Sequence, residues 1–450
     1  MWGLTRARSI KIKRILNIAI PSGLQSGLDM LSVSIALFYL GSISSLHFTA
    51  LGIGAKYIIV FYPISAIFGI GTNVLMSRRF GAKNFIEMNK VYATMTWSAC
   101  VVAIPMLFVI YFGIPIYLNL FELSSSLYQL TYSYVSLTIF ALPSIIIKNV
   151  LISGFAATGD TKRPFFIKVA LTLVSMLGYS ILINGWFGLH QMGLTGAAYV
   201  TLFISYLELI VLLLLPRFVK TKLSLSFYFN REFLFNAFKV GIPTGLERIF
   251  TIVSLNIVLV FVGYYSVIYN DSAMSGFQAG TTIEGFSFVP GFGFMLAVMT
   301  LVGQSIGAKN YQHAHDYTKL CAIISSILLG ICGAILAVFA TPLSKIFIHD
   351  DLLGIEISVA YLIAVGLSQI PLILSFVYDG ALRGAGFTQI PLFINIASIS
   401  IFRLLPMWIC ANFGWSIFIL FGIIFVETYI RAFIFYLVFR SGIWKKSKSL

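Results

Sequence analysis

The sequence predicts an all-α integral membrane protein with twelve transmembrane helices. Of its 450 residues, 59% are hydrophobic and only 10% are charged, whereas soluble domains carry roughly a quarter charged residues. This composition also excludes disorder, which requires low hydrophobicity and many charges. The apolar residues fall in runs of about 20 or more, the length that a helix needs to cross a bilayer. The four cysteines lie inside these runs and show neither a disulfide framework nor metal-ligand spacing.

The net charge of +15 requires an explanation of its own. A nucleic-acid-binding protein collects its basic residues on a soluble face, together with side chains that read bases. Here the lysines and arginines occupy short segments between apolar runs, where the lipid surface and the positive-inside rule account for them. We therefore expect membrane lipid as a partner and no nucleic acid.

The first span follows a basic stretch over residues 6–14. Its apolar run, Ile15–Leu40, is too long for the core of a signal peptide and lacks a convincing cleavage site, so we interpret it as a membrane helix. The expected spans are residues 15–40, 48–76, 91–113, 127–154, 165–185, 193–216, 235–262, 275–304, 317–340, 357–382, 391–411 and 415–439. Twelve spans use about 240 residues and leave room only for short loops and helix ends, so no separate soluble domain fits.

The basic residues also predict the orientation. Twenty-four of the 30 lie on one side of the expected membrane, whereas the opposite loops hold only Lys345. The positive-inside rule then places both termini in the cytoplasm, which requires an even number of spans. We expect a multi-pass protein of the plasma membrane.

Three short motifs occur twice, in the same order. Both repeats therefore contain six helices and start from the same side, as in transporters with a central site between parallel halves. The predicted organisation is a six-helix lobe at 1–216, a cytoplasmic linker at 217–240 and a second lobe at 241–450. The repeated motifs are Ile-Pro21-Ser-Gly-Leu24 with Ile-Pro243-Thr-Gly-Leu246, Gly81-Ala-Lys-Asn84 with Gly307-Ala-Lys-Asn310, and Ala157–Pro164 with Gly384–Pro391, at offsets of 222, 226 and 227.

Local geometry explains two of these motifs. We expect Pro21 and Pro243 in the first turns of their helices, where a missing N–H costs little. Gly-Ala-Lys-Asn is expected to form a turn in which glycine takes a positive φ and asparagine bonds its own backbone.

The repeated motifs resemble those of the multidrug and toxic compound extrusion (MATE) family over nearly the whole chain. The resemblance is also carried by Leu301–Asn310, Gly380–Gly386, Gly193–Ala198 and Ile283–Pro290. It implies two six-helix lobes in a V and a secondary antiporter, which is not an enzyme. Such a protein would expel organic, often cationic, compounds in exchange for protons or sodium, without a cofactor. We expect a monomer.

Acidic residues inside the spans are the candidates for ion coupling, because an ionised group at mid-bilayer costs about 3 kcal/mol on insertion scales. When the two repeats are overlaid, Gln25 matches Glu247 and Asp29 matches Thr251, which predicts matched polar stripes. The alternatives are salt bridges, from Asp29 to Lys56 or Lys148 and from Glu247 to its neighbour Arg248.

Two further acids complete the candidate set. Glu284 fits the family pattern of Ile-Glu before Phe-x-Pro, so it could attract a cationic substrate or carry a proton. Asp379 is the fourth candidate, with a simple ion pair to Arg383 as its alternative. Glu427 and Arg431, four residues apart, are expected to form a structural ion pair.

The sequence departs from the family at its usual acidic positions. Ala36 stands where many relatives have a helix-one aspartate, and Thr251 where others have a helix-seven glutamate. The helix-ten region carries Pro371 and Leu372 in place of an acid. The family's ion sites therefore cannot be carried over, and the coupling ion stays open between H⁺ and Na⁺.

A cavity for a flat organic cation would be lined by aromatic and polar side chains, since ring faces attract cations. The expected substrate-binding residues are Gln25, Tyr57, Phe61, Phe277, Gln278, Phe286 and Tyr378. The main alternative function is a flippase of lipid-linked oligosaccharides from the same superfamily, which would have more cationic groups in its cavity. The loop signature of a major-facilitator carrier and the motifs of membrane enzymes are absent from the sequence.

Overall fold

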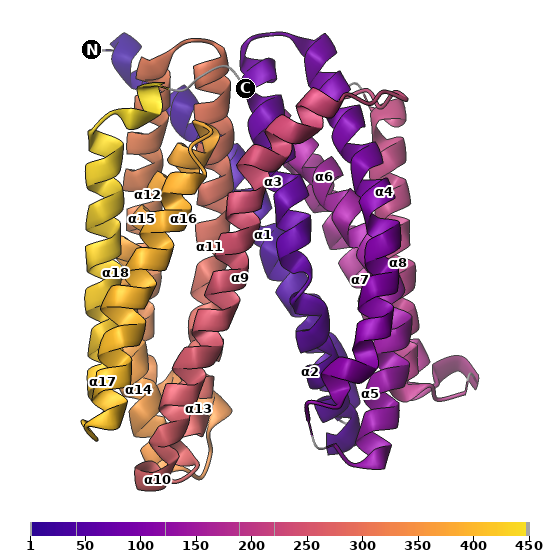
Figure 1. The fold of residues 1–450 in the computed structure, drawn as a ribbon, viewed down its shortest axis with the longest axis vertical. Helices are drawn as coiled ribbons and strands as arrows, with labels where there is room; N and C mark the ends of the chain where they lie inside the picture. Colours follow the sequence, from indigo (N-terminus) through magenta and orange to yellow (C-terminus); the bar gives the residue numbers. More distant parts are fainter. Residues whose placement is uncertain (1, 42, 122, 189, 220, 447–450) are drawn as a thin grey trace. The chain divides into compact units, whose positions relative to one another are not determined.

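The computed structural model describes residues 2–41, 43–121, 123–188, 190–219 and 221–446, and every regular element in them is helical. Ten helices are long and apolar enough to cross a membrane. Two further pairs of helices pass the same test together, each bent at a short break, which gives up to twelve spans (Figure 1). The predicted fold class, an all-α membrane protein, is confirmed.

The unbroken spans coincide with the apolar runs of the sequence. They are α1 (Trp2–Gly41), α4 (Phe85–Leu118), α5 to α6 (Ser125–Thr138 and Leu142–Thr158, joined by η1, Ile139–Ala141), α7 (Lys162–Asn184), α8 (Gly193–Phe218), α9 (Arg231–Tyr264), α11 (Ser272–Gly307), α12 (Tyr311–Val338), α16 to α17 (Gln389–Ser398 and Leu405–Asn412, joined by the π-helical η3, Ile399–Leu404) and α18 (Ile417–Arg440). Short elements connect them: η2 (Trp186–Gly188), α10 (Ser266–Tyr269), α13 (Ala340–Phe347) and η4 (Ile443–Lys446).

The two bent spans break next to prolines. Helices α2 (Ser45–Ile59) and α3 (Tyr62–Gly81) meet at 43°, and α14 (Leu352–Leu367) and α15 (Gln369–Gly384) meet at 50°. Pro63 and Pro371 lie in the first turns of α3 and α15, where a proline removes no intrahelical hydrogen bond that a new helix would make.

The expectation for Pro21 and Pro243 is wrong. Both lie inside long helices, α1 and α9, because these helices begin more than ten residues before the proline. Proline in a helix interior removes a backbone hydrogen bond and favours a kink.

The expectation for the Gly-Ala-Lys-Asn turns is half right. The positive φ belongs to the lysines, 60° at Lys83 and 54° at Lys309, and not to the glycines. The asparagines do bond the local backbone, since each caps the next helix. The side chain of Asn84 accepts from the Glu87 N–H at 3.1 Å, and that of Asn310 accepts from the His313 N–H at 2.9 Å.

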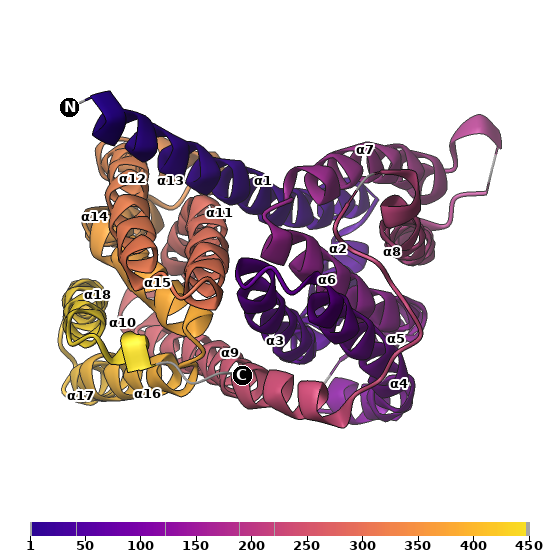
Figure 2. The ribbon, with the colours of Figure 1, turned by 90° about the horizontal axis from the view of Figure 1, so that it is seen from above.

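Packing divides the chain into two units. Unit 1 comprises residues 1–23 and 246–450, and unit 2 comprises residues 24–245. Residues 1–23 thus group with most of the second predicted lobe, 241–450, and residues 217–245, which include the predicted linker 217–240, group with most of the first, 1–216. In unit 1, α15 packs against α11, α12 and α18 (Figure 2).

Close contacts between helices hold the early part of α1 in unit 1 and the early part of α9 in unit 2. In unit 1, a methyl group on Gly293 of α11 would collide with the Ala19 carbonyl and with Gly23 of α1. In unit 2, a methyl group on Gly71 of α3 would lie 2.6 Å from the Ala237 carbonyl oxygen of α9. Gly71 and Gly293 are 222 residues apart, the offset of the first repeated motif.

The close contact at Gly293 predicts that adding a single methyl group there lowers the stability of the protein substantially. Gly293→Ala is expected to destabilise the protein by about 1–3 kcal/mol, because the backbone of α1 blocks the new side chain. Gly422→Ala, in α18, meets nothing within 4 Å and is expected to be neutral or slightly stabilising, since alanine favours a helix. Thermal unfolding of both variants in detergent measures the difference. Equal unfolding temperatures would contradict this account of the crossing.

Candidate functional site

The intramembrane acid of α1 belongs to a chain of alternating charges in unit 2. The Lys168 ammonium of α7 lies 2.5 Å from an Asp29 carboxylate oxygen and 3.5 Å from Glu208 of α8. Glu208 in turn accepts a hydrogen bond from Lys148 of α6 at 2.5 Å. Two lysines thus balance two carboxylates, which lowers the free-energy cost of placing these charges inside membrane spans.

The two ends of this chain differ in burial. The side chain of Glu208 is 2% exposed, whereas that of Asp29 is 62% exposed at the surface of unit 2. An exposed carboxylate in a span must meet water or other polar groups, because contact with lipid tails would be very costly. The expected salt-bridge alternative named the wrong partner: Asp29 pairs with Lys168 and not with Lys56 or Lys148.

In unit 1, two candidate acids share one guanidinium. Arg383 of α15, 1% exposed, donates to Asp379 one turn earlier and to Glu247 of α9, with Nη2–O distances of 2.9 and 2.7 Å. The other Glu247 oxygen accepts from the Asn395 amide of α16 at 2.9 Å. The pair of Asp379 and Arg383, foreseen as an alternative, is therefore present, and Glu247 pairs with Arg383 and not with the adjacent Arg248.

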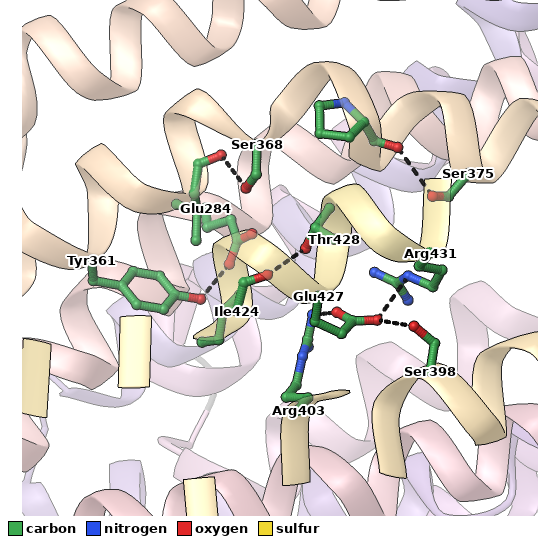
Figure 3. A network of polar contacts seen from close by, with 12 residues as sticks. Glu284, Tyr361, Ser368, Ser375, Ser398, Arg403, Ile424, Glu427, Thr428 and Arg431 are labelled. Carbon is green, nitrogen blue, oxygen red and sulfur yellow. Dashed lines mark hydrogen bonds and ion pairs between the residues drawn. The ribbon is translucent and has the colours of Figure 1, made fainter. Parts of the chain in front are cut away.

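A second buried cluster in unit 1 centres on Glu427 (Figure 3). Its carboxylate is fully buried and pairs with Arg403 of η3 and, at 3.3 Å, with Arg431 one turn later. The Ser398 hydroxyl donates a hydrogen bond to it at 2.9 Å. The predicted ion pair of Glu427 and Arg431 is confirmed. Two guanidinium groups therefore balance this one carboxylate.

Glu284 has a different environment from the other candidates. Its carboxylate accepts a hydrogen bond from the Tyr361 hydroxyl of α14 (Figure 3). Among the described residues, no cationic side chain lies within ion-pair distance of it. Of the four predicted coupling acids, Glu284 is therefore the one whose direct partner is neutral.

Aromatic rings surround this pair. Phe277 packs edge-on against the Tyr361 ring at 5.4 Å and parallel to Phe421 at 6.4 Å. Phe277 is buried, whereas Gln278 and Phe286 lie on the exposed face of α11, where Phe286 is 59% exposed. A helix turns by about 100° per residue, so Glu284 lies between the buried and the exposed faces of α11.

The remaining predicted binding residues are scattered. Tyr57 is buried in unit 2, with its hydroxyl donating to the Ile110 carbonyl at 2.6 Å, and Phe61 packs edge-on against its ring. Gln25 is half-buried on the unit 2 part of α1. Tyr378 is half-buried in unit 1, where it packs against Tyr436 at 5.9 Å.

Four polar residues of these networks escaped the sequence analysis. They are Lys168, Glu208, Tyr361 and Asn395. Glu208 carried the one usable signal, since a lone acid in an apolar run needs a cation. Nothing in the sequence indicated which lysine would supply it.

Comparison with known proteins identifies the family. The model of the MatE family matches residues 19–181 and 243–409, the greater part of both repeats. The chain belongs to the MATE family. It is therefore a multi-pass membrane transporter and not an enzyme.

Relatives of this MATE protein cover most of its length at low identity. It is 26% identical to the probable multidrug resistance protein NorM of Thermotoga maritima, over 96% of this chain and 93% of the relative. It is 21% identical to the probable multidrug resistance protein NorM of Neisseria meningitidis, over 75% and 74%. The chain therefore resembles multidrug efflux proteins.

Solved structures share the fold. A transporter of the MOP superfamily from Pyrococcus furiosus superposes with a TM-score of 0.90 at 16% identity, over 98% of this chain and 97% of that one. An outward-facing MATE transporter of the same superfamily superposes with a TM-score of 0.89 at 16% identity, over the same shares of the two chains. At this identity the match establishes the fold alone.

The pairing of Glu208 with two lysines predicts that the stability of the protein depends strongly on this buried carboxylate. Glu208→Gln leaves Lys148 and Lys168 without their shared carboxylate, and breaking a buried pair in this way costs about 3–5 kcal/mol. Glu356→Gln, an exposed site on α14, removes the same charge and is expected to change stability by less than about 0.5 kcal/mol. Thermal unfolding in detergent measures both. A Glu208 variant as stable as the control would show that the chain of charges contributes little.

Proposed function

We propose that this MATE protein is a secondary active efflux antiporter, which exports organic cations in exchange for protons or sodium. The lobes at 1–216 and 241–450 would expose a central site alternately to the cytoplasm and to the outside of the plasma membrane. Both termini would be cytoplasmic, and the protein would act as a monomer. The multidrug resistance proteins among its relatives support small-molecule export.

The observation that carries the proposal is the neutral partner of Glu284. An ionised carboxylate in a membrane span is costly without a counter-charge, and the Tyr361 hydroxyl offers only a hydrogen bond. A proton, a sodium ion or a cationic substrate could each neutralise it. One carboxylate accepts one of them at a time, so entry of the ion drives out the cargo.

The other predicted acids would play weaker parts in coupling. Glu247 and Asp379 are held by Arg383, a group that stays charged, so their neutralisation requires a broken ion pair. Asp29 is exposed and pairs with a lysine that Glu208 also contacts. Because its side chain is 62% exposed and open to an incoming ion, Asp29 is the second candidate for ion exchange.

Cargo would bind near the exposed face of α11. Gln278 and Phe286 lie on that face and are available to a ligand. Phe277 and Tyr57 are packed in the interior of their units, so they would support neighbouring residues and not contact the cargo directly. Aromatic faces attract flat cations, with about 0.5–2 kcal/mol for each good contact.

Export in sealed vesicles tests the role of Glu284. Glu284→Gln is expected to lower the initial rate of ion-driven export of a fluorescent organic cation by about tenfold or more, equivalent to at least about 1.4 kcal/mol in the barrier. Separately imposed pH and sodium gradients identify the ion, and Glu356→Gln is the matched control. Normal export by a correctly folded Glu284 variant would remove this residue from the mechanism.

One observation favours a second function, the flipping of a lipid-linked anionic sugar. Lys56 is exposed on α2 within a bent span. Among the described residues, no acid lies within ion-pair distance of it. An exposed lysine within a membrane span must contact water or an anion, and a pyrophosphate group is such an anion.

Lys56→Gln separates the two functions. For a cation exporter, the variant is expected to transport a fluorescent cation no more than about twofold more slowly than the original, because an ammonium group makes no attractive contact with a cationic cargo. For a flippase, it is expected to lose transfer of a fluorescent polyprenyl pyrophosphate between bilayer leaflets. Transfer of that lipid by the original protein and its loss in the variant would replace the efflux proposal.

A further inference from the structure

Unit 1 contains a groove of about 730 Å³ apart from the acidic networks. Helices α12 and α18 form its walls, and both pack on α15, which contributes Leu374 and Tyr378. The groove reaches the end of α18 and the following η4, where Trp444 and Lys445 line it. It therefore runs from the interior of a span to the end of that span.

The polar part of the groove is positively charged. His315, Lys319, Arg440 and Lys445 line it, and no lining residue is acidic. All four side chains are exposed. Among the described residues, neither Lys319 nor Arg440 forms an ion pair, and Lys445 lies over the Trp444 ring at 5.6 Å. This end of the groove is therefore complementary to an anion.

The rest of the groove is apolar. Phe439 stacks on Trp444 at 5.2 Å with the rings nearly parallel, and the Trp444 N–H donates to the Phe439 carbonyl at 3.0 Å. Below this stack, Ile323, Ile327 and Leu374 continue the lining. Ile323 and Ile327 are exposed on α12, on a surface that faces lipid if the helix spans the membrane. This part is complementary to a hydrocarbon chain.

We propose that this groove binds an anionic glycerophospholipid. Its phosphate would lie between Lys319 and Arg440, and one acyl chain would extend along Ile323 and Ile327. Basic pockets between transmembrane helices bind lipid headgroups in this manner. A zwitterionic headgroup would bring its own positive charge to a cluster that has no acid. A free phosphate would leave the apolar length of the groove empty.

Lipid titration of the purified full-length protein in detergent tests the proposal. Phosphatidylglycerol is expected to raise the unfolding temperature saturably and to remain bound in native mass spectrometry, whereas phosphatidylcholine with the same chains does neither. Inorganic phosphate in excess is expected not to displace the lipid. Equal responses to the two lipids, or displacement by phosphate, would overturn the proposal.

Variants locate the site. Lys319→Gln with Arg440→Gln is expected to weaken phosphatidylglycerol binding about thirty-fold, from the usual contribution of two basic residues near a membrane surface. The control pair, Lys162→Gln with Lys239→Gln, removes two exposed charges in unit 2 and is expected to leave binding within about twofold. Equal losses in the two pairs would indicate a general charge effect and overturn the site.

Two more variants keep the test decisive if the double variant does not fold. Lys319→Arg with Arg440→Lys keeps both charges and is expected to retain binding within about fivefold. Ile327→Trp narrows the apolar wall without changing charge and is expected to weaken lipid binding. Unchanged lipid binding by Ile327→Trp would overturn the placement of the acyl chain.

Discussion

The cost of a charge inside the bilayer governs the arrangement of this protein. Six acids lie within the apolar spans expected from the sequence, and an isolated ionised acid there would be strongly destabilising. Five of them have a lysine or arginine within ion-pair distance: Asp29, Glu208, Glu247, Asp379 and Glu427. Except for Asp379 and Arg383, which share α15, these pairs also join elements that are distant in the chain. In those cases the same interaction neutralises the charge and holds the helices together. Glu284, with a tyrosine as its direct partner, departs from that pattern.

The sequence predicts what depends on local periodicity. Apolar runs predicted the ten helices that are long and apolar enough to cross a membrane and also the two bent pairs, since each span needs about 20 consecutive apolar residues. The ion pairs of Glu427 with Arg431 and of Asp379 with Arg383 were also foreseeable, because residues four apart share a helix face. Glu247 and Arg383 are 136 residues apart, and no periodicity relates two helices at that separation. Their pairing depends on how α9 and α15 pack.

The errors have the same origin. Pro21 and Pro243 were expected in first turns because hydropathy marks where a helix enters lipid and not where the helix begins. Both helices begin earlier, in polar and basic sequence that the apolar pattern does not register. The glycines of the Gly-Ala-Lys-Asn turns were expected to take the positive φ, yet Lys83 and Lys309 take it. In each turn the asparagine caps the following helix, and the lysine before it adopts the unfavourable positive φ.

The two repeats share their close helix crossings but not their ion pairs. The glycine crossings at Gly71 and Gly293 recur at the offset of the first motif, because a helix crossing needs a small residue at the same depth in both repeats. The ionic networks do not recur. Deep in the spans, lysines balance Asp29 and Glu208 of unit 2, whereas arginines balance Glu247, Asp379 and Glu427 of unit 1.

This chemical difference has a consequence for ion exchange. A guanidinium stays protonated and can hold a carboxylate with two parallel hydrogen bonds, whereas an ammonium is a point charge on a flexible stem. Arg383 therefore fixes its two acids, but Lys168 is shared between the buried Glu208 and the exposed Asp29. Neutralising Asp29 with a proton or cation would leave Lys168 still paired with Glu208. Arg383 would likewise stay paired with one acid if the other were neutralised, so the two clusters differ mainly in exposure. The side chain of Asp29 is 62% exposed, whereas those of Glu247 and Asp379 are 13% and 7% exposed.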